Sequence, residues 1–150
     1  MVAKKKVLGW REWVELPGLK VGRIKAKLDT GARTSALHAF NVKPYTKYGA
    51  AHVRFDVHPV QRKKKPSVRC RALVIDHRTI TNSGGDREER LVIRTKIKIG
   101  KETFPIELTL TDRDEMGFRL LLGRQALRRR YVVDPARGFA AGKKKKTATK

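Results

Sequence analysis

The sequence predicts an all-β domain, and three observations lead to this fold class. Apolar and polar residues alternate with a period of two in several segments, which is the pattern of strands that bury one face. Turn residues separate these segments, and a long hairpin is predicted around the adjacent glycines Gly84 and Gly85. Only one segment, residues 125–130, has a good helical pattern. A chain of 150 residues suits one such domain with a modest core.

The first strands lead to a carboxylate. Residues 7–14 carry two tryptophans and are predicted as one strand whose aromatic side chains pack on the barrel or on a partner subunit. After a Pro-Gly turn, residues 21–28 alternate and deliver Asp29 into a turn at Thr30 and Gly31. A lone Asp-Thr-Gly triplet is most often a structural turn. Held at the end of a strand, such a carboxylate is fixed in place, as catalysis requires.

The next segments are predicted from their turn residues and their alternation. Residues 35–40 are partly apolar, whereas residues 41–51 are interpreted as an irregular connection because they contain proline and glycine. A strand is predicted at 53–57 and a basic loop at 61–66.

The second half is predicted as a meander of strands. Two alternating strands, 68–75 and 90–99, flank the hairpin that carries Gly84 and Gly85. Glycines at a hairpin tip let it open and close over a ligand, although an ordinary mobile hairpin has the same pattern. The remaining elements are a returning strand, a core segment, a short helix and a closing strand, expected at residues 105–110, 120–122, 125–130 and 131–133.

Composition limits the partners and the compartment. The 37 lysines and arginines exceed the 14 acids and give a net charge of +23, which attracts nucleic acid, acidic protein tails or an anionic membrane alike. Cys70 is the only cysteine, so a reducing compartment, the cytoplasm, is expected. No signal-like or membrane-spanning apolar run is present. We expect a domain at 7–140, a basic tail at 1–6 and a disordered basic tail at 141–150.

Two distant motifs carry a family resemblance. The loop Asp29-Thr30-Gly31-Ala32 and the segment Leu121-Leu122-Gly123-Arg124 resemble the retropepsin-like aspartic peptidases, in which a segment of the second kind packs against a loop of the first kind. Together with residues 27–39, 109–116 and 133–135, they are similar to a RimB-type subfamily that is labelled "putative ATP-dependent zinc protease". Its best understood members act with a ribosomal-protein glutamate ligase and trim glutamate tails. The likeness covers residues 8–138.

The resemblance implies a fold and a set of site residues. The fold would be a retropepsin-like acid-protease barrel with a flap hairpin and one short C-terminal helix. The catalytic group would be Asp29, Thr30 and Gly31. Substrate would contact Ala32, Arg33, Ser83, Gly84, Gly85 and Arg90. The loop would be supported by Thr34, His38, Leu122, Gly123 and Arg124.

Carboxylate chemistry requires a second copy of the chain. Peptide hydrolysis needs one ionised and one protonated acid, and two adjacent carboxyl groups naturally share a proton. Because the sequence holds one Asp-Thr-Gly, we expect a homodimer in which Asp29 of each subunit meets at a two-fold axis.

No metal and no cofactor is expected. The zinc motif His-Glu-x-x-His and a phosphate-binding Gly-x-x-x-x-Gly-Lys loop are both absent, and the histidines and Cys70 lack metal-ligand spacing. Cys70 is interpreted as a strand residue rather than a nucleophile. His38 is interpreted as a polar residue that satisfies the Asp29 loop rather than as a proton carrier.

Arg33 and the overall function each keep two interpretations. The Arg33 guanidinium is expected either to bind substrate carboxylates or to form a salt bridge with Asp112, Glu115 or another internal acid. The chain is expected to be a cytoplasmic peptidase that acts on an acidic, glutamate-rich protein tail, such as that of a ribosomal protein. The alternative is a non-catalytic RNA- or ribosome-binding β-barrel protein, although the five Phe and three Tyr are dispersed along the chain. Both hold if the substrate lies on a ribosome.

Overall fold

The computed structural model describes residues 5–60, 65–81, 84–112 and 117–142. Its strands are β1 (Lys6–Gly9), β2 (Arg11–Leu16), β3 (Val21–Leu28), β4 (Ser35–His38), β5 (Phe40–Lys47), β6 (Ala50–Val57), β7 (Val68–Thr81), β8 (Arg87–Ile99), β9 (Glu102–Thr111), β10 (Leu120–Leu122) and β11 (Tyr131–Asp134). A 3₁₀ turn, η1 (Pro17–Leu19), and one short helix, α1 (Arg124–Leu127), complete the elements of the described ranges.

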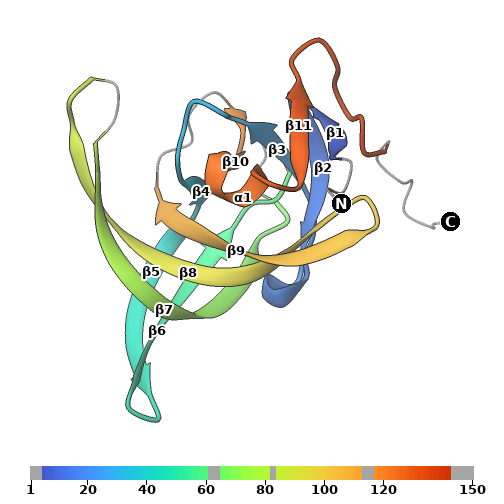
Figure 1. The fold of residues 1–150 in the computed structure, drawn as a ribbon. Helices are drawn as coiled ribbons and strands as arrows, with labels where there is room; N and C mark the ends of the chain where they lie inside the picture. The colour runs from blue at the N-terminus through green and yellow to red at the C-terminus, as the bar shows by residue number, and fades with distance from the viewer. Residues whose placement is uncertain (1–4, 61–64, 82–83, 113–116, 143–150) are drawn as a thin grey trace, which may run out of the picture.

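Six strands close into a barrel (Figure 1). The main sheet runs in the order β2-β3-β10-β4-β9-β8-β7-β6-β5, and β2 also pairs with β8, which joins the first six strands into a ring. The closing register places Val14 opposite Ile99. Fully buried side chains such as Ile24, Leu37 and Leu120 belong to one apolar cluster. The predicted all-β barrel with one short helix is therefore confirmed.

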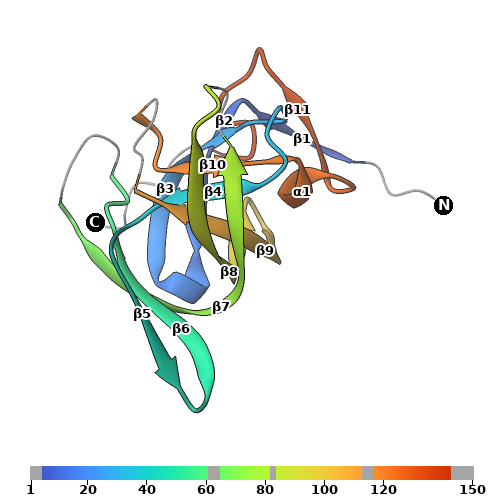
Figure 2. The same ribbon diagram turned by 90° about the vertical axis from the view of Figure 1, so that its left-hand side faces the viewer.

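Two hairpins extend from this barrel. Figures 1 and 2 show β7 and β8 curving upward to a free tip, while the β5–β6 hairpin projects in the opposite direction. β3 has the bounds that its alternation predicts, whereas β7 and β8 continue past the expected range toward the tip. The long hairpin predicted around Gly84 and Gly85 is therefore confirmed.

The prediction of an irregular connection at 41–51 is wrong. Most of this segment belongs to β5 and β6, which are joined by a tight turn at Tyr48 and Gly49. Both turn residues have positive φ, 51° and 75°, the conformation of the two-residue hairpin turn whose twist matches that of the strands. Pro44 is tolerated because β5 is an edge strand, where a missing N–H costs no ladder hydrogen bond.

The predicted single strand at 7–14 is in fact two. β1 pairs in parallel with β11 in a separate sheet, and β2 enters the barrel. Between them, the Trp10 N–H donates to Arg137 O (2.8 Å). The fully buried Glu12 carboxylate accepts hydrogen bonds from the backbone N–H groups of Gly9 (2.6 Å), Ala140 (2.9 Å) and Ala141 (3.0 Å). These bonds fasten the C-terminal segment to β2.

The domain limits and the basic segments stay predictions. β1 already includes Lys6, and Ala141 still bonds to Glu12. Residues 1–4 and 143–150 of the expected tails, residues 61–64 of the basic loop, and Ser83 lie outside the described residues. The helix predicted at 125–130 is a single turn that ends at Leu127.

In the part of the chain that the structure describes, no helix is long and apolar enough to cross a membrane.

Candidate active site

Asp29 stands where β3 ends beside β10. Leu28 is the register partner of Leu122, and the Asp29 N–H donates to Leu122 O (2.8 Å). The Asp29 carboxylate accepts a hydrogen bond at Oδ1 from the N–H of Gly31 in the same loop (3.1 Å). The Asp29 side chain is partly exposed. The loop therefore presents a carboxylate that the backbone orients and that a ligand can reach.

The segment that follows β10 packs closely under this loop. A Cβ at Gly123 would lie 2.5 Å from Thr34 O and 2.9 Å from Ala32 O, so only glycine fits. The Arg124 guanidinium donates to Gly31 O (3.0 Å) and the Arg124 N–H to Ala32 O (2.8 Å). The structure thus brings Leu122, Gly123 and Arg124 to the Asp29 loop, with Thr34 directly against Gly123.

Ser35 links the loop to the neighbouring strands, a role that was not predicted from the sequence. Its hydroxyl accepts a hydrogen bond from the Gly123 N–H (3.0 Å), and its carbonyl accepts one from the Thr109 hydroxyl (3.0 Å). Both residues are buried. A Ser in the motif after Asp-Thr-Gly is a weak signal because turns favour serine, and its partner Thr109 is distant in the sequence.

An open groove separates the Asp29 loop from β7. Residues of the loop, of β7 and of α1 line it: Gly31, Ala32, Arg33, Thr34, Arg78, Thr79, Ile80, Thr81 and Gln125. Arg33 is exposed here, and it makes no ion pair within the described part of the chain. Asp112 therefore does not hold it, and Glu115 lies outside the described residues.

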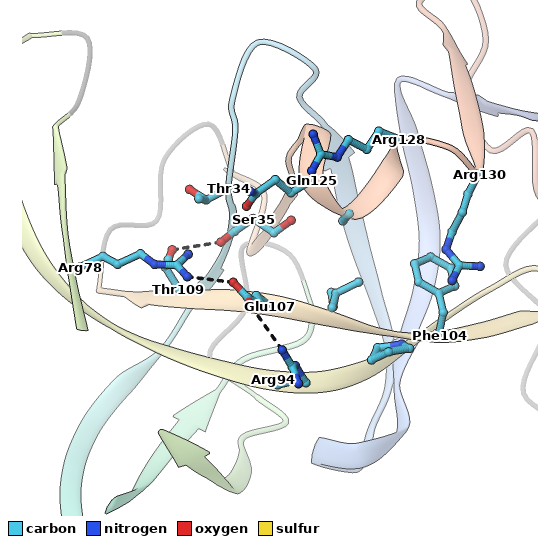
Figure 3. A pocket seen from close by; sticks show the side chains of 13 residues that line it. Thr34, Ser35, Arg78, Arg94, Phe104, Glu107, Thr109, Gln125, Arg128 and Arg130 are labelled. Carbon is cyan, nitrogen blue, oxygen red and sulfur yellow. Dashed lines mark hydrogen bonds and ion pairs between the residues drawn. The ribbon is translucent and has the colours of Figure 1, made fainter. Parts of the chain in front are cut away.

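A second pocket, shown in Figure 3, shares Thr34, Arg78 and Gln125 with this groove. Four arginines face it from β7, β8 and the segment after α1, namely Arg78, Arg94, Arg128 and Arg130. One lining carboxylate, Glu107, opposes them and lies 3.0 Å from Arg78 Nη2 and 3.6 Å from Arg94 Nη2. Arg78 also bonds Asp76 at 2.8 Å, which lowers the pKa of that carboxyl below its usual value. The pocket retains an excess of positive charge.

Arg90 does not lie at the hairpin tip. Its side chain is 12% exposed, and its guanidinium lies 3.0 Å from Glu88 Oε1 and 3.3 Å from the Thr109 hydroxyl. Arg90 therefore connects β8 to β9, and its expected contact with substrate stays a prediction. Gly84 and Gly85 are exposed at the tip, and Gly85 has φ +88°, which a larger residue rarely adopts.

His38 is also placed differently from the expectation. It lies at the opposite end of β4 from Ser35, where its N–H donates to Arg119 O (2.8 Å). Its ring faces Phe40, which stacks on His58 with 4.1 Å between ring centroids. Burial lowers the pKa of His58 below its usual value. His38 therefore belongs to a small aromatic cluster and not to the Asp29 loop.

Cys70 is a buried residue of β7. Its thiol donates to Leu19 O (3.5 Å), and burial raises its pKa to about 12. Such a thiol carries almost no thiolate at neutral pH, so it is not a nucleophile. Among the described residues, no three His, Cys, Asp or Glu side chains gather in a way that could hold a metal ion.

Comparison with known proteins supplies a family. Residues 7–144 match the model of a family described as RimB-like, retropepsin-like aspartic endopeptidase RimB. The chain is 44% identical over 144 residues to a "probable alpha-L-glutamate ligase" of Shewanella pealeana, and 47% identical over 138 residues to one of Desulfotalea psychrophila. These alignments cover 96% and 92% of this chain but 31% and 30% of the relatives, so the chain spans less than a third of their length.

A solved structure is similar over nearly its whole length. It is a crystal structure of a Legionella pneumophila protein of unknown function, with a TM-score of 0.77 and 29% sequence identity. The likeness covers 92% of this chain and 99% of that one.

Proposed function

The chain belongs to the RimB-like family of retropepsin-like aspartic endopeptidases, and from this premise we propose that it is a homodimeric aspartic peptidase with Asp29 as its catalytic residue. The observation that carries the proposal is the Asp29 loop, in which a reachable carboxylate is held by Gly31 and packed from below by Gly123. A carboxylate fixed in this way is prepared to activate water.

The proposed dimer follows from the chemistry of two acids. One carboxylate must be ionised to activate water while the other is protonated to polarise the carbonyl group. The chain supplies one Asp-Thr-Gly loop, and a two-fold axis beside Asp29 would supply the second. Two such carboxyl groups in contact would share a single proton.

The proposed substrate is an acidic, glutamate-rich protein tail in the cytoplasm, such as that of a ribosomal protein. Exposed Arg33 beside Asp29 and the four arginines of the adjoining pocket favour carboxylates near the cut bond. The net charge of +23 adds long-range attraction to such a tail. The ligase name of the relatives points to glutamate chemistry, and it belongs to proteins more than three times as long as the matched region.

We assign cleavage rather than ligation to residues 7–144 because the family description that matches them names an endopeptidase. The purified chain is therefore expected to shorten a glutamate-tailed peptide without ATP. Addition of glutamate to the same peptide only when ATP is present would contradict the assignment.

Asp29→Asn is the decisive variant. The amide keeps the size of the side chain but can neither act as a base nor share a proton, so we expect cleavage to be abolished while folding and dimerisation persist. The measurement is peptide cleavage followed by mass spectrometry, with circular dichroism and sedimentation as checks. Asp112→Asn, an exposed acid without a matching loop, is the matched control and should retain activity. Retained activity in Asp29→Asn, or loss with EDTA and rescue by zinc, would refute an aspartic mechanism.

Arg33→Asp tests the preference for acidic residues. We compare peptides that differ only in Glu or Gln beside the cut, and we expect the wild type to favour Glu by about 1 to 3 kcal/mol in kcat/KM, the range of a charge-assisted hydrogen bond. The variant should lose this preference, whereas Lys101→Asp, the same charge change at the exposed β8–β9 turn, should keep it. An unchanged preference in Arg33→Asp would assign Arg33 to structure.

A further inference from the structure

The hairpin that the sequence did not predict carries a row of positive charge. In the registers of β5, β6 and β7, Lys43 lies opposite Arg54, and Arg54 lies opposite Arg71. Side chains directly opposite one another on neighbouring strands point to the same face of a sheet. The three cations therefore cross the sheet side by side, and all three line an open groove with Pro44 and Tyr45.

A second row, of apolar and aromatic groups, lies next to the first on the same face. Tyr45 is opposite His52, and His52 is opposite Leu73, each two residues along its strand from a member of the basic row. The rings of Tyr45 and His52 stack with 5.4 Å between centroids and 26° between planes. The His52 Nδ1–H donates to Ala50 O (3.0 Å), which fixes the ring. Leu73 is 48% exposed.

These two rows form what we call the outer face of β5–β6–β7. On β6 and β7, alternate residues such as Val53, Phe55 and Cys70 point the other way and are buried in the core. At the end of the hairpin, Tyr48 is 96% exposed, and Lys47 Nζ lies 5.6 Å from its ring centroid. Figures 1 and 2 show this hairpin projecting away from the end of the barrel that holds β10 and α1.

The basic row places like charges next to one another, although Arg54 also attracts the Asp56 carboxylate and helps to lower its pKa. Like charges placed directly opposite on adjacent strands destabilise a sheet, and Lys43, Arg54 and Arg71 repeat this arrangement twice. The nearby buried carboxylate of Asp56 is engaged by Asn41 (3.0 Å) and Arg69 (3.3 Å). A bound polyanion would relieve the repulsion within the row.

We propose that the outer face of β5–β6–β7 binds single-stranded nucleic acid. Bases would stack on Tyr45, His52 and the exposed Tyr48, while phosphates would contact Lys43, Arg54 and Arg71. A solvent-facing sheet that combines aromatic rings with flanking cations is the arrangement that single strands recognise. An acidic peptide would use the cations but would have no use for the stacked rings. This function is separate from Asp29 and would hold the enzyme near an RNA.

The test measures fluorescence anisotropy of a short labelled oligouridylate, an oligothymidylate of equal length and a poly-glutamate peptide. Because a chain of net charge +23 attracts any polyanion, variants that keep the charge are decisive. Tyr45→Ala should weaken binding of both oligonucleotides by about tenfold, as expected for loss of one base stack, whereas Tyr45→Phe should bind like the wild type. Equal affinity for the two oligonucleotides, or a preference for the oligouridylate, supports the proposal.

Arg54→Gln tests the basic row against a matched control. It should reduce the salt dependence of oligonucleotide binding by about one phosphate contact, whereas Lys96→Gln, an exposed lysine on β8 of the barrel, should change it little. Asp29→Asn should bind as the wild type does, which separates this proposal from the proposed peptidase. The proposal is overturned if folded Tyr45→Ala binds the oligonucleotides as tightly as the wild type does. It is also overturned if the wild type binds poly-glutamate as tightly as it binds the oligonucleotides, and if Arg54→Gln weakens this binding while Tyr45→Ala does not.

Discussion

At the scale of single residues, the Cys70 thiol shows how burial decides reactivity. It lies in β7 with 2% exposure, bonds to Leu19 O, and has a pKa raised to about 12. At pH 8 the thiolate fraction is then negligible, and we expect iodoacetamide to leave the native protein unmodified while the denatured chain reacts fully. Mass spectrometry after timed labelling measures both. Rapid labelling of the native protein, at the rate of the denatured one, would contradict the burial described here.

Arg33 and Arg90 show that residue type alone does not assign a role. Both are arginines near elements implied in substrate binding, but Arg33 is exposed in the groove, whereas Arg90 is engaged by Glu88 and Thr109. A guanidinium already satisfied by internal partners has few donors left for a substrate.

At the scale of elements, the β10–α1 segment supports the Asp29 loop through Gly123. In Gly123→Ala the new methyl group would overlap the carbonyl oxygen of Thr34 at 2.5 Å, which is backbone and cannot rotate away. We expect the free energy of unfolding to fall by about 1 to 3 kcal/mol and peptide cleavage to fall with it, because the loop must shift. Urea denaturation and initial rates measure the two effects.

Gly22→Ala is the matched control for this prediction. A Cβ at Gly22 meets no other atom within 4 Å, and the residue lies on the same strand that leads to Asp29. We expect this variant to keep both stability and activity. Equal behaviour of the two alanine variants would mean that the contact with Thr34 is not what holds the loop.

At the scale of the whole molecule, the proposed activity depends on association. Specific activity should fall when the protein is diluted below its dimer dissociation constant, because a monomer offers only one Asp29. Inactive Asp29→Asn chains mixed with a fixed amount of wild type should lower its activity by forming mixed dimers. Sedimentation over the same concentrations relates activity to the dimer fraction. Specific activity that is constant across the monomer–dimer transition would exclude a shared site.

Part of the fold could be predicted from the sequence because it is locally determined. The period-two alternation of residues 21–28 predicts β3 with the same bounds that the structure shows, and the glycine-containing turn after it positions Asp29. The pairing of the Asp-Thr-Gly loop with the Leu-Leu-Gly-Arg segment was accessible only because the two motifs resemble a family. The β5–β6 hairpin was missed because Tyr48 occupies a positive-φ turn position where Asn or Gly is the usual signal.

By itself, the sequence determined the fold class, the strand that leads to Asp29 and the high positive charge. Alternation and turn chemistry act between near neighbours, and charge is a simple sum, so no knowledge of distant contacts is needed. Only the tertiary structure decided which residues meet. In the folded chain, one pocket is lined by Arg78, Arg94, Arg128 and Arg130. His38 lies at the end of β4 that is remote from the Asp29 loop. Strand register places Lys43, Arg54 and Arg71 in one row. These outcomes depend on strand register and barrel closure, which are fixed by side chains far apart in the chain that bury one another.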